Sequence, residues 1–142
     1  MLLRQTFTII FVVTAVAASD PRLAQLDQDT RDLLNMLHDS CIEETGLDES
    51  LGWIDKARTG EFTEDQTFKN YLGCIYMQTG ALAEDGEADY DAMLAVLPEQ
   101  FLERATKMVN QCRHVRENNA PDTAFVLNKC LYKADPEYYF IF

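Results

Sequence analysis

Four cysteines are the most reactive side chains of this sequence: Cys41, Cys74, Cys112 and Cys130. In an oxidising compartment all four can pair as disulfides, and four cysteines allow three different connectivities. The chain has no Cys-x-x-Cys pair and no Cys/His cluster at ligand spacing. The pattern therefore favours disulfides over a zinc site, and we expect no metal and no cofactor.

A histidine and an aspartate precede the first cysteine, in the string His38-Asp39-Ser40-Cys41. The string resembles the His-Asp-x-Cys of secreted phospholipases A2, in which the histidine is a general base and the aspartate holds calcium. That site also needs a glycine-rich calcium loop upstream, and residues 20–37 contain no glycine. A secreted lipid-hydrolysing enzyme is therefore a disfavoured alternative, and we assign no catalytic residue. A polar helix face near a helix C-terminus accounts for the histidine as well.

The charged residues are strongly unbalanced toward acid. The chain of 142 residues has 24 Asp and Glu against 12 Lys and Arg, a formal net charge of −12 at pH 7. Binding to nucleic acid or to an anionic membrane surface depends on Lys and Arg, so we expect neither partner. With 47% hydrophobic residues the chain is too apolar for a disordered acidic segment, and its length fits one domain.

Residues 1–19 have the three parts of a secretory signal peptide. Arg4 is the positive residue, an apolar run extends from Phe7 to Val13, and small residues around Ala17 provide a cleavage site. Because the stretch is short for a membrane span, an N-terminal anchor is the less favoured alternative. We therefore expect a secreted, extracellular protein whose mature domain covers residues 20–142.

The mature sequence has helical periodicity throughout and no sustained strand-like alternation. Apolar residues recur every three or four positions from Leu23 to Cys41, with Asp20 as the expected cap and Gly46 as the expected stop. Further helices are expected over about 48–58, 63–79, 89–97, 98–115 and 122–133, and a capping box at residues 63–66 begins the third helix. The predicted fold class is all-α: a compact, disulfide-stapled domain of six helices with an apolar tail over 134–142.

These features together resemble the insect odorant-binding proteins, which comprise pheromone-binding and general odorant-binding proteins. The resemblance spans nearly the whole mature chain and includes the strings Glu44–Gly46 and Phe68–Cys74 and the Leu97-Pro98 junction. The family usually has six cysteines, and the second and fifth, which pair with each other, would fall on Asn70 and Pro121. The sequence thus resembles the four-cysteine, minus-C branch, which implies the disulfides Cys41–Cys74 and Cys112–Cys130.

The resemblance also implies an apolar cavity between the helices, in which a small hydrophobic molecule binds. Flexible methionines suit such a cavity, and a tyrosine hydroxyl, of Tyr76 or Tyr132, is expected to orient a polar head group. The expected ligand-binding residues come from helices and tail: Leu72, Ile75, Tyr76, Met93, Leu94, Leu97, Met108, Val109, Ala124, Leu127, Leu131, Phe140 and Phe142.

The tail ends in five apolar or aromatic residues, 138–142, which are costly to leave in water. They are expected either to dock in a surface groove or, as the resemblance implies, to cover the cavity as a lid. Acid could release such a lid through the terminal carboxylate or through one of four side chains: Asp135, Glu137, His38 and His114.

The function that the resemblance implies is a secreted carrier of odorants or pheromones in sensillum lymph, which would deliver its ligand to an olfactory receptor. A non-sensory carrier of lipids or other small hydrophobic molecules in haemolymph or another secretion is the alternative among binding proteins. The ligand, the tissue of expression and the formation of a homodimer stay open at this point.

Overall fold

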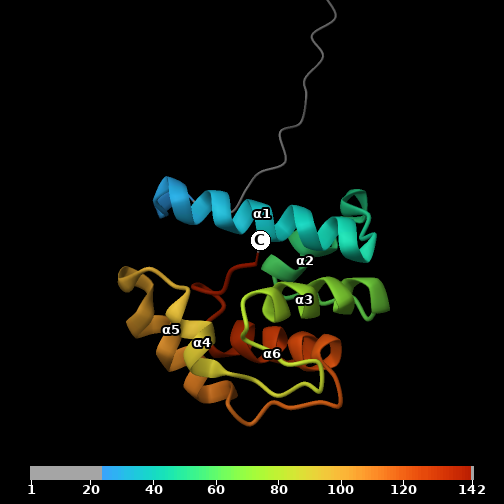
Figure 1. Ribbon diagram of the computed structural model, residues 1–142. Helices are drawn as coiled ribbons and strands as arrows, with labels where there is room; N and C mark the ends of the chain where they lie inside the picture. Colours follow the sequence, from blue (N-terminus) through green and yellow to red (C-terminus); the bar gives the residue numbers. More distant parts are fainter. Residues whose placement is uncertain (1–23, 142) are drawn as a thin grey trace, which may run out of the picture.

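The computed structural model describes residues 24–141, and in this part of the chain the fold is all-α, as predicted (Figure 1). The expected signal peptide, Asp20, Leu23 and Phe142 lie outside the described residues. The described elements are α1 (Gln28–Thr45), the 3₁₀ helix η2 (Glu49–Leu51), α2 (Trp53–Arg58), α3 (Gln66–Gln78), α4 (Tyr90–Ala95), α5 (Glu99–Cys112) and α6 (Ala120–Ala134).

Two helices begin later than their sequence patterns predict, and in both cases an aspartate is the reason. Asp27 accepts a hydrogen bond from the backbone N–H of Thr30 at 2.9 Å, so α1 begins after it and Leu26 precedes the helix. Asp65 accepts from the N–H groups of Thr67 and Phe68, so it caps α3 in place of the expected capping box. A single carboxylate that reaches free N–H groups decides the helix start more strongly than the periodicity around it.

Other helix boundaries also differ from the predicted ones. The segment expected as one helix over 48–58 is interrupted at Gly52, whose φ of 68° is left-handed and separates η2 from α2. Helix α5 ends at Cys112, before Val115. Helix α6 begins at Ala120 because Asn119 caps it by accepting from the N–H of Asp122.

Helices α3 and α6 pack against each other, with α1 across α3 and α5 beside α6 (Figure 1). At the crossing of α3 and α6, a Cβ atom built on Gly73 would lie 2.9 Å from the backbone nitrogen of Pro121, so only glycine permits this approach. The disulfides Cys41–Cys74 and Cys112–Cys130 link α1 to α3 and α5 to α6. Both pairings are the ones that the family resemblance implied.

The chain after α6 returns to the body of the domain instead of extending into solvent. Tyr139 is 2% exposed and Ile141 is also buried. The guanidinium Nε of Arg58 in α2 donates to the carbonyl oxygen of Ile141 at 3.1 Å. The tail is therefore a packed element that joins α6 to α2.

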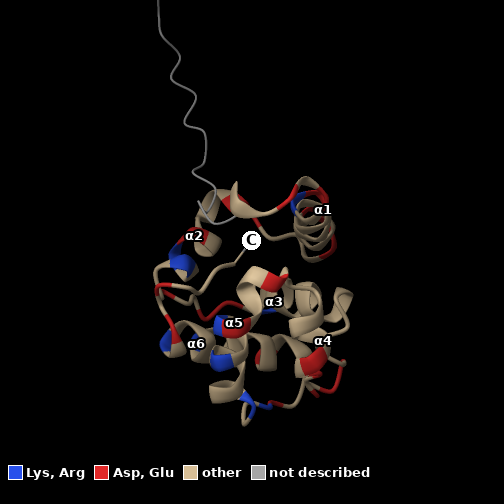
Figure 2. Cartoon of the chain, turned by 90° about the vertical axis from the view of Figure 1, so that its left-hand side faces the viewer, with Lys and Arg blue, Asp and Glu red and all other residues tan. Residues whose placement is uncertain are grey.

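The outer surface is predominantly acidic, and Figure 2 shows Asp and Glu spread over the helices with fewer Lys and Arg among them. Within residues 24–141, no helix combines the length and the apolar composition that crossing a bilayer requires.

Candidate ligand-binding cavity

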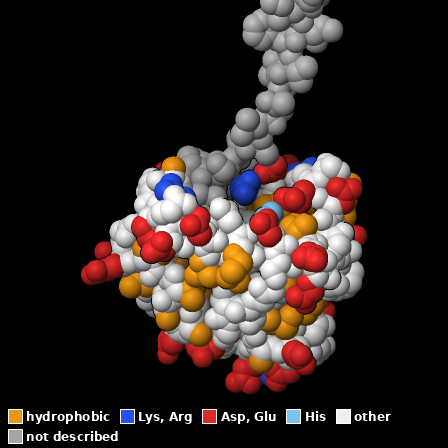
Figure 3. All heavy atoms as spheres, turned by 45° about the horizontal axis from the view of Figure 1, so that its top comes forward, with side chains coloured by type: hydrophobic (Ala, Val, Ile, Leu, Met, Phe, Trp, Pro, Cys, Tyr) orange, Lys and Arg blue, Asp and Glu red, His pale blue; other side chains and the backbone are white. Residues whose placement is uncertain are grey.

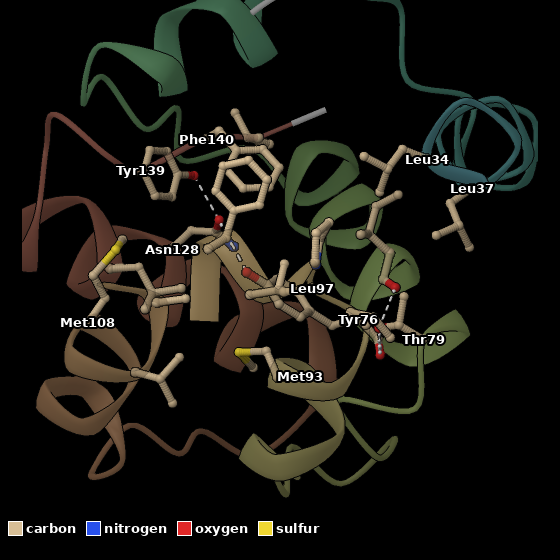
Figure 4. A pocket seen from close by; sticks show the side chains of 18 of the residues that line it. Leu34, Leu37, Tyr76, Thr79, Met93, Leu97, Met108, Asn128, Tyr139 and Phe140 are labelled. Atoms are coloured by element: carbon tan, nitrogen blue, oxygen red, sulfur yellow. Dashed lines mark hydrogen bonds between the residues drawn. The ribbon is translucent and has the colours of Figure 1, made fainter. Parts of the chain in front are cut away.

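A cavity of about 420 Å³ lies between α1, α3, α4, α5, α6 and the tail (Figure 4). This volume falls within the range of about 300–1,000 Å³ that is typical of small-molecule sites. Apolar side chains make up most of the lining.

Most of the predicted ligand-binding residues line this cavity: Leu72, Ile75, Tyr76, Met93, Leu97, Met108, Val109, Leu131 and Phe140. Ala124 and Leu127 do not line it, because they lie on the fully buried side of α6 in the packed core. Leu94 packs against the same core and is likewise outside the lining. Phe142 lies outside the described residues.

The sequence prediction missed one wall of the cavity and part of the tail. The missed residues come from α1 and the segment before it, from the end of α3, from the α4–α5 corner and α5, from α6 and from the tail: Leu26, Thr30, Leu33, Leu34, Leu37, Gln78, Thr79, Val96, Pro98, Phe101, Ala105, Asn128, Tyr138, Tyr139 and Ile141. The periodic apolar face of α1 is a clear signal, but periodicity alone does not distinguish a helix face on a packed core from one on an empty space.

Two residues that line the cavity also reach solvent, one on α1 and one at the corner that joins α4 to α5. Leu33 is 44% exposed and Val96 is 47% exposed, although both line the cavity. On the face in Figure 3, apolar side chains reach the surface between acidic groups. The cavity lining is therefore not fully enclosed by the described residues.

Three polar side chains of the described lining, those of Asn128, Tyr76 and Tyr139, form a hydrogen-bonded cluster (Figure 4). Asn128 is 3% exposed, and its Oδ1 accepts from the hydroxyl of Tyr139 at 2.7 Å and from the hydroxyl of Tyr76 at 3.5 Å. Its Nδ2 donates to the backbone oxygen of Ala124 at 2.8 Å. Burial raises the pKa of Tyr76 to about 12 and raises the pKa of Tyr139 well above its usual value. Both hydroxyls are therefore neutral hydrogen-bond donors over the physiological pH range.

Tyr132, the other tyrosine considered for a polar head group, lies outside the lining. Its hydroxyl donates to the backbone oxygen of Thr59 at 3.0 Å. Its ring packs edge-on against Phe62 and Tyr139, at centroid distances of 6.2 and 5.6 Å. Tyr132 therefore packs against Tyr139 of the tail and does not line the cavity.

The tail forms a wall of the cavity through four consecutive residues, Tyr138 to Ile141. Its start is held by Arg104 of α5, whose Nη2 donates to Asp135 at 2.9 Å and to Glu137 at 3.1 Å. The same guanidinium lies 4.6 Å from the ring centroid of Tyr138. The docking site of the tail is thus the cavity itself, whereas its movement as a lid stays a prediction.

His38 does not face this cavity. Its Nδ1 is hydrogen-bonded to the Tyr71 hydroxyl at 2.8 Å, and its Nε2 to Glu49 at 2.9 Å. Both ring nitrogens are thus used in joining α1 to α3 and η2. Over residues 24–141, no group of three or more His, Cys, Asp or Glu side chains is arranged to hold a metal ion.

Known proteins include a family whose profile matches this chain and solved structures with a similar fold. The profile described as the PBP/GOBP family matches residues 23–134. The B2 protein of Tenebrio molitor is 32% identical over 116 residues, which are 80% of this chain and 88% of that protein.

Solved structures of insect proteins are similar as well. Odorant-binding protein lmigOBP1 of Locusta migratoria superposes with a TM-score of 0.68 at 26% identity, over 75% of this chain and 81% of that one. Odorant-binding protein 7 of Anopheles gambiae, solved with four disulfide bridges and in complex with an azo compound, has a TM-score of 0.68 at 21% identity. That match covers 79% of this chain and 90% of the mosquito chain, and at this identity it shows the fold alone.

Proposed function

The chain belongs to the PBP/GOBP family, and we propose that it is a secreted carrier of small hydrophobic molecules, odorants or pheromones, which bind in the cavity between its helices. The observation that carries the proposal is a mostly apolar cavity of about 420 Å³ whose lining residues Leu33 and Val96 are partly exposed to solvent. The azo compound bound to the mosquito protein of the same fold supports it.

Burial of apolar surface alone supplies enough free energy for such a carrier. Each buried CH₂ group contributes about 0.8 kcal/mol. A ligand of roughly ten carbons then reaches about micromolar affinity after the cost of association. The acidic exterior keeps the loaded protein soluble, and the signal-peptide pattern of residues 1–19 together with two disulfides supports secretion.

A pair of identical substitutions tests whether the ligand occupies this cavity. Ala105 of α5 lines the cavity, whereas Ala95 of α4 is exposed and does not line it. In Ala105→Trp the indole fills part of the space, so the affinity for the fluorescent probe N-phenylnaphthylamine is expected to fall by about 10-fold or more. In Ala95→Trp the affinity is expected to stay at the wild-type value. Titration of the probe, with displacement by decanol, measures both.

The proposal is wrong if the wild-type protein does not bind the probe, or if binding is equally strong in both variants. Addition of EDTA separates a carrier from a calcium-dependent lipid hydrolase, because removal of calcium leaves a carrier's affinity unchanged.

A further inference from the structure

The polar cluster inside the cavity gives the ligand class more sharply than the cavity volume does. Asn128, Tyr76 and Tyr139 come from α6, α3 and the tail, and their polar ends point toward one another in a lining that is mostly apolar (Figure 4). A polar group on a ligand that enters this space loses its water, and it must find a hydrogen-bond partner here to avoid a cost of a few kcal/mol.

The two tyrosine hydroxyls form hydrogen bonds of different strength with Asn128. The Tyr139 bond at 2.7 Å has the usual length for O–H···O, whereas the Tyr76 bond at 3.5 Å is at the limit of a hydrogen bond. Turning the Tyr76 hydroxyl from Asn128 toward a ligand therefore loses only a weak hydrogen bond. Its O–H can donate to a carbonyl or hydroxyl oxygen, and its lone pairs can accept from an alcohol.

The lining also determines which ligands are rejected. None of the described lining residues is Lys, Arg, His, Asp or Glu. An ionised head group would thus lose its hydration with no opposite charge to replace it. A carboxylate is disfavoured for this reason, even with the same alkyl chain.

We propose that the cavity selects uncharged ligands that carry one terminal oxygen, and that Tyr76 is the residue that binds this oxygen beside Asn128, while the alkyl chain lies against Met93 and Leu97. This inference rests on the proposed carrier function. It makes Tyr76 a specificity-determining residue, because its hydroxyl distinguishes an oxygenated ligand from a hydrocarbon of the same length.

The test compares ten-carbon ligands in the full protein and in two variants that each remove one hydroxyl. Tyr76→Phe removes the hydroxyl in the cavity, and Tyr132→Phe removes one that bonds to Thr59 outside the lining. Affinities for decanol, methyl octyl ketone and decane are measured by displacement of N-phenylnaphthylamine. Tyr76→Phe is expected to lower the affinity for decanol and for the ketone by about 3- to 10-fold and to leave the affinity for decane unchanged. Tyr132→Phe is expected to change none of the three.

Two further measurements make the result independent of any general damage to the fold. The carbonyl stretching band of the bound ketone is expected at lower frequency in wild type than in Tyr76→Phe, because only the wild type donates a hydrogen bond to it. At pH 7, decanoate is expected to bind at least about 10-fold more weakly than decanamide, which has nearly the same shape and no charge.

Equal weakening of decanol and decane in Tyr76→Phe, or no weakening of either, would overturn the role of Tyr76 and leave the carrier function intact. Binding of decanoate as tight as that of decanamide would overturn the selection of uncharged ligands. Failure of every ten-carbon ligand to bind wild type would instead overturn the proposed function, and this inference with it.

Discussion

The two ends of the apolar face of helix α3 border very different regions. Near the N-terminal end, Phe68 and Tyr71 are fully buried, and Trp53 of α2 packs edge-on against Phe68 at a centroid distance of 6.3 Å. Toward the C-terminal end, Leu72 and Tyr76 border the cavity. These residues share one helical face with one spacing, so the difference arises from what lies opposite each end and not from the helix itself.

The covalent links account for part of this difference. Cys41 lies in the C-terminal part of α1, where the bond to Cys74 holds α1 close to α3. The N-terminal part of α1, with Thr30 and Leu34, borders the cavity instead. A helix fixed near one end can leave space beneath the other end. We call the buried cluster around Phe68 the packed side, and the residues that line the cavity the cavity side.

The largest effect that separates the two sides is expected from truncation of a buried side chain. Phe68→Ala leaves a new void in a filled region and is expected to reduce the free energy of unfolding by about 3–5 kcal/mol. Met108→Ala enlarges a space that already exists, so its cost is expected near the lower end of the range for such truncations, about 2 kcal/mol. Urea unfolding of the ligand-free proteins measures both values.

The same two substitutions are expected to rank in the opposite order in their effect on ligand binding. Met108 lines the cavity and Phe68 does not. Met108→Ala should therefore change the preference for ligand length in folded protein, whereas Phe68→Ala should not. Equal losses of stability in the two variants would contradict the distinction between a packed side and a cavity side.

A smaller effect is expected from a third disulfide at the contact between α3 and α6. A Cβ atom built on Gly73 of α3 would lie 2.9 Å from the backbone nitrogen of Pro121 of α6, and Asn70 is one turn of α3 before Gly73, so positions 70 and 121 belong to the same contact between helices. Asn70→Cys with Pro121→Cys is expected to form a bond and to raise the free energy of unfolding by about 1–2 kcal/mol, less than a first disulfide gives, because the two existing disulfides already restrict the unfolded chain. Thermal unfolding and a thiol count measure it.

The single variant Asn70→Cys is the control, since it has the same new side chain without a partner. Two free thiols in the double variant under oxidising conditions would show that the positions assigned to the missing cysteines are wrong.

Sequence patterns predicted the helical fold well, because helical periodicity is a local signal. The four cysteines alone left three pairings open, and the two observed disulfides followed only from the family resemblance. The patterns failed where a single side chain decides a boundary, as Asp27 and Asp65 do. In the cavity they found Met93 and Met108 but included Leu127, because Leu127 and the lining residue Leu131 are one turn apart on the same apolar face of α6. Asn128 was missed because a lone asparagine in a helix has no sequence signal that marks it as buried.

The smallest expected effect concerns the tail and its response to acid. Hydrogen bonds from Arg104 hold the pKa of Asp135 below its usual value of 3.8. A lowered pKa means that the contact favours the docked tail fully above pH 4 and is lost as the pH falls through the pKa of the docked carboxylate. Between pH 7 and pH 5, Asp135 is ionised whether or not the tail is docked. Binding of N-phenylnaphthylamine is therefore expected to be the same at both pH values and to weaken only below about pH 4.

Arg104→Gln tests this pH dependence, with Lys107→Gln on the same helix as its matched control. Lys107 pairs with Glu103 one turn away within α5, whereas Arg104 reaches the tail at Asp135 and Glu137. The Arg104 variant is expected to bind the probe slightly more weakly at pH 7 and to lose part of the further weakening below pH 4, whereas the Lys107 variant should match wild type. A marked loss of wild-type binding between pH 7 and pH 5 would contradict this account. Such a loss would mean that a group other than Asp135 controls the tail, because protonation of this carboxylate occurs only at lower pH.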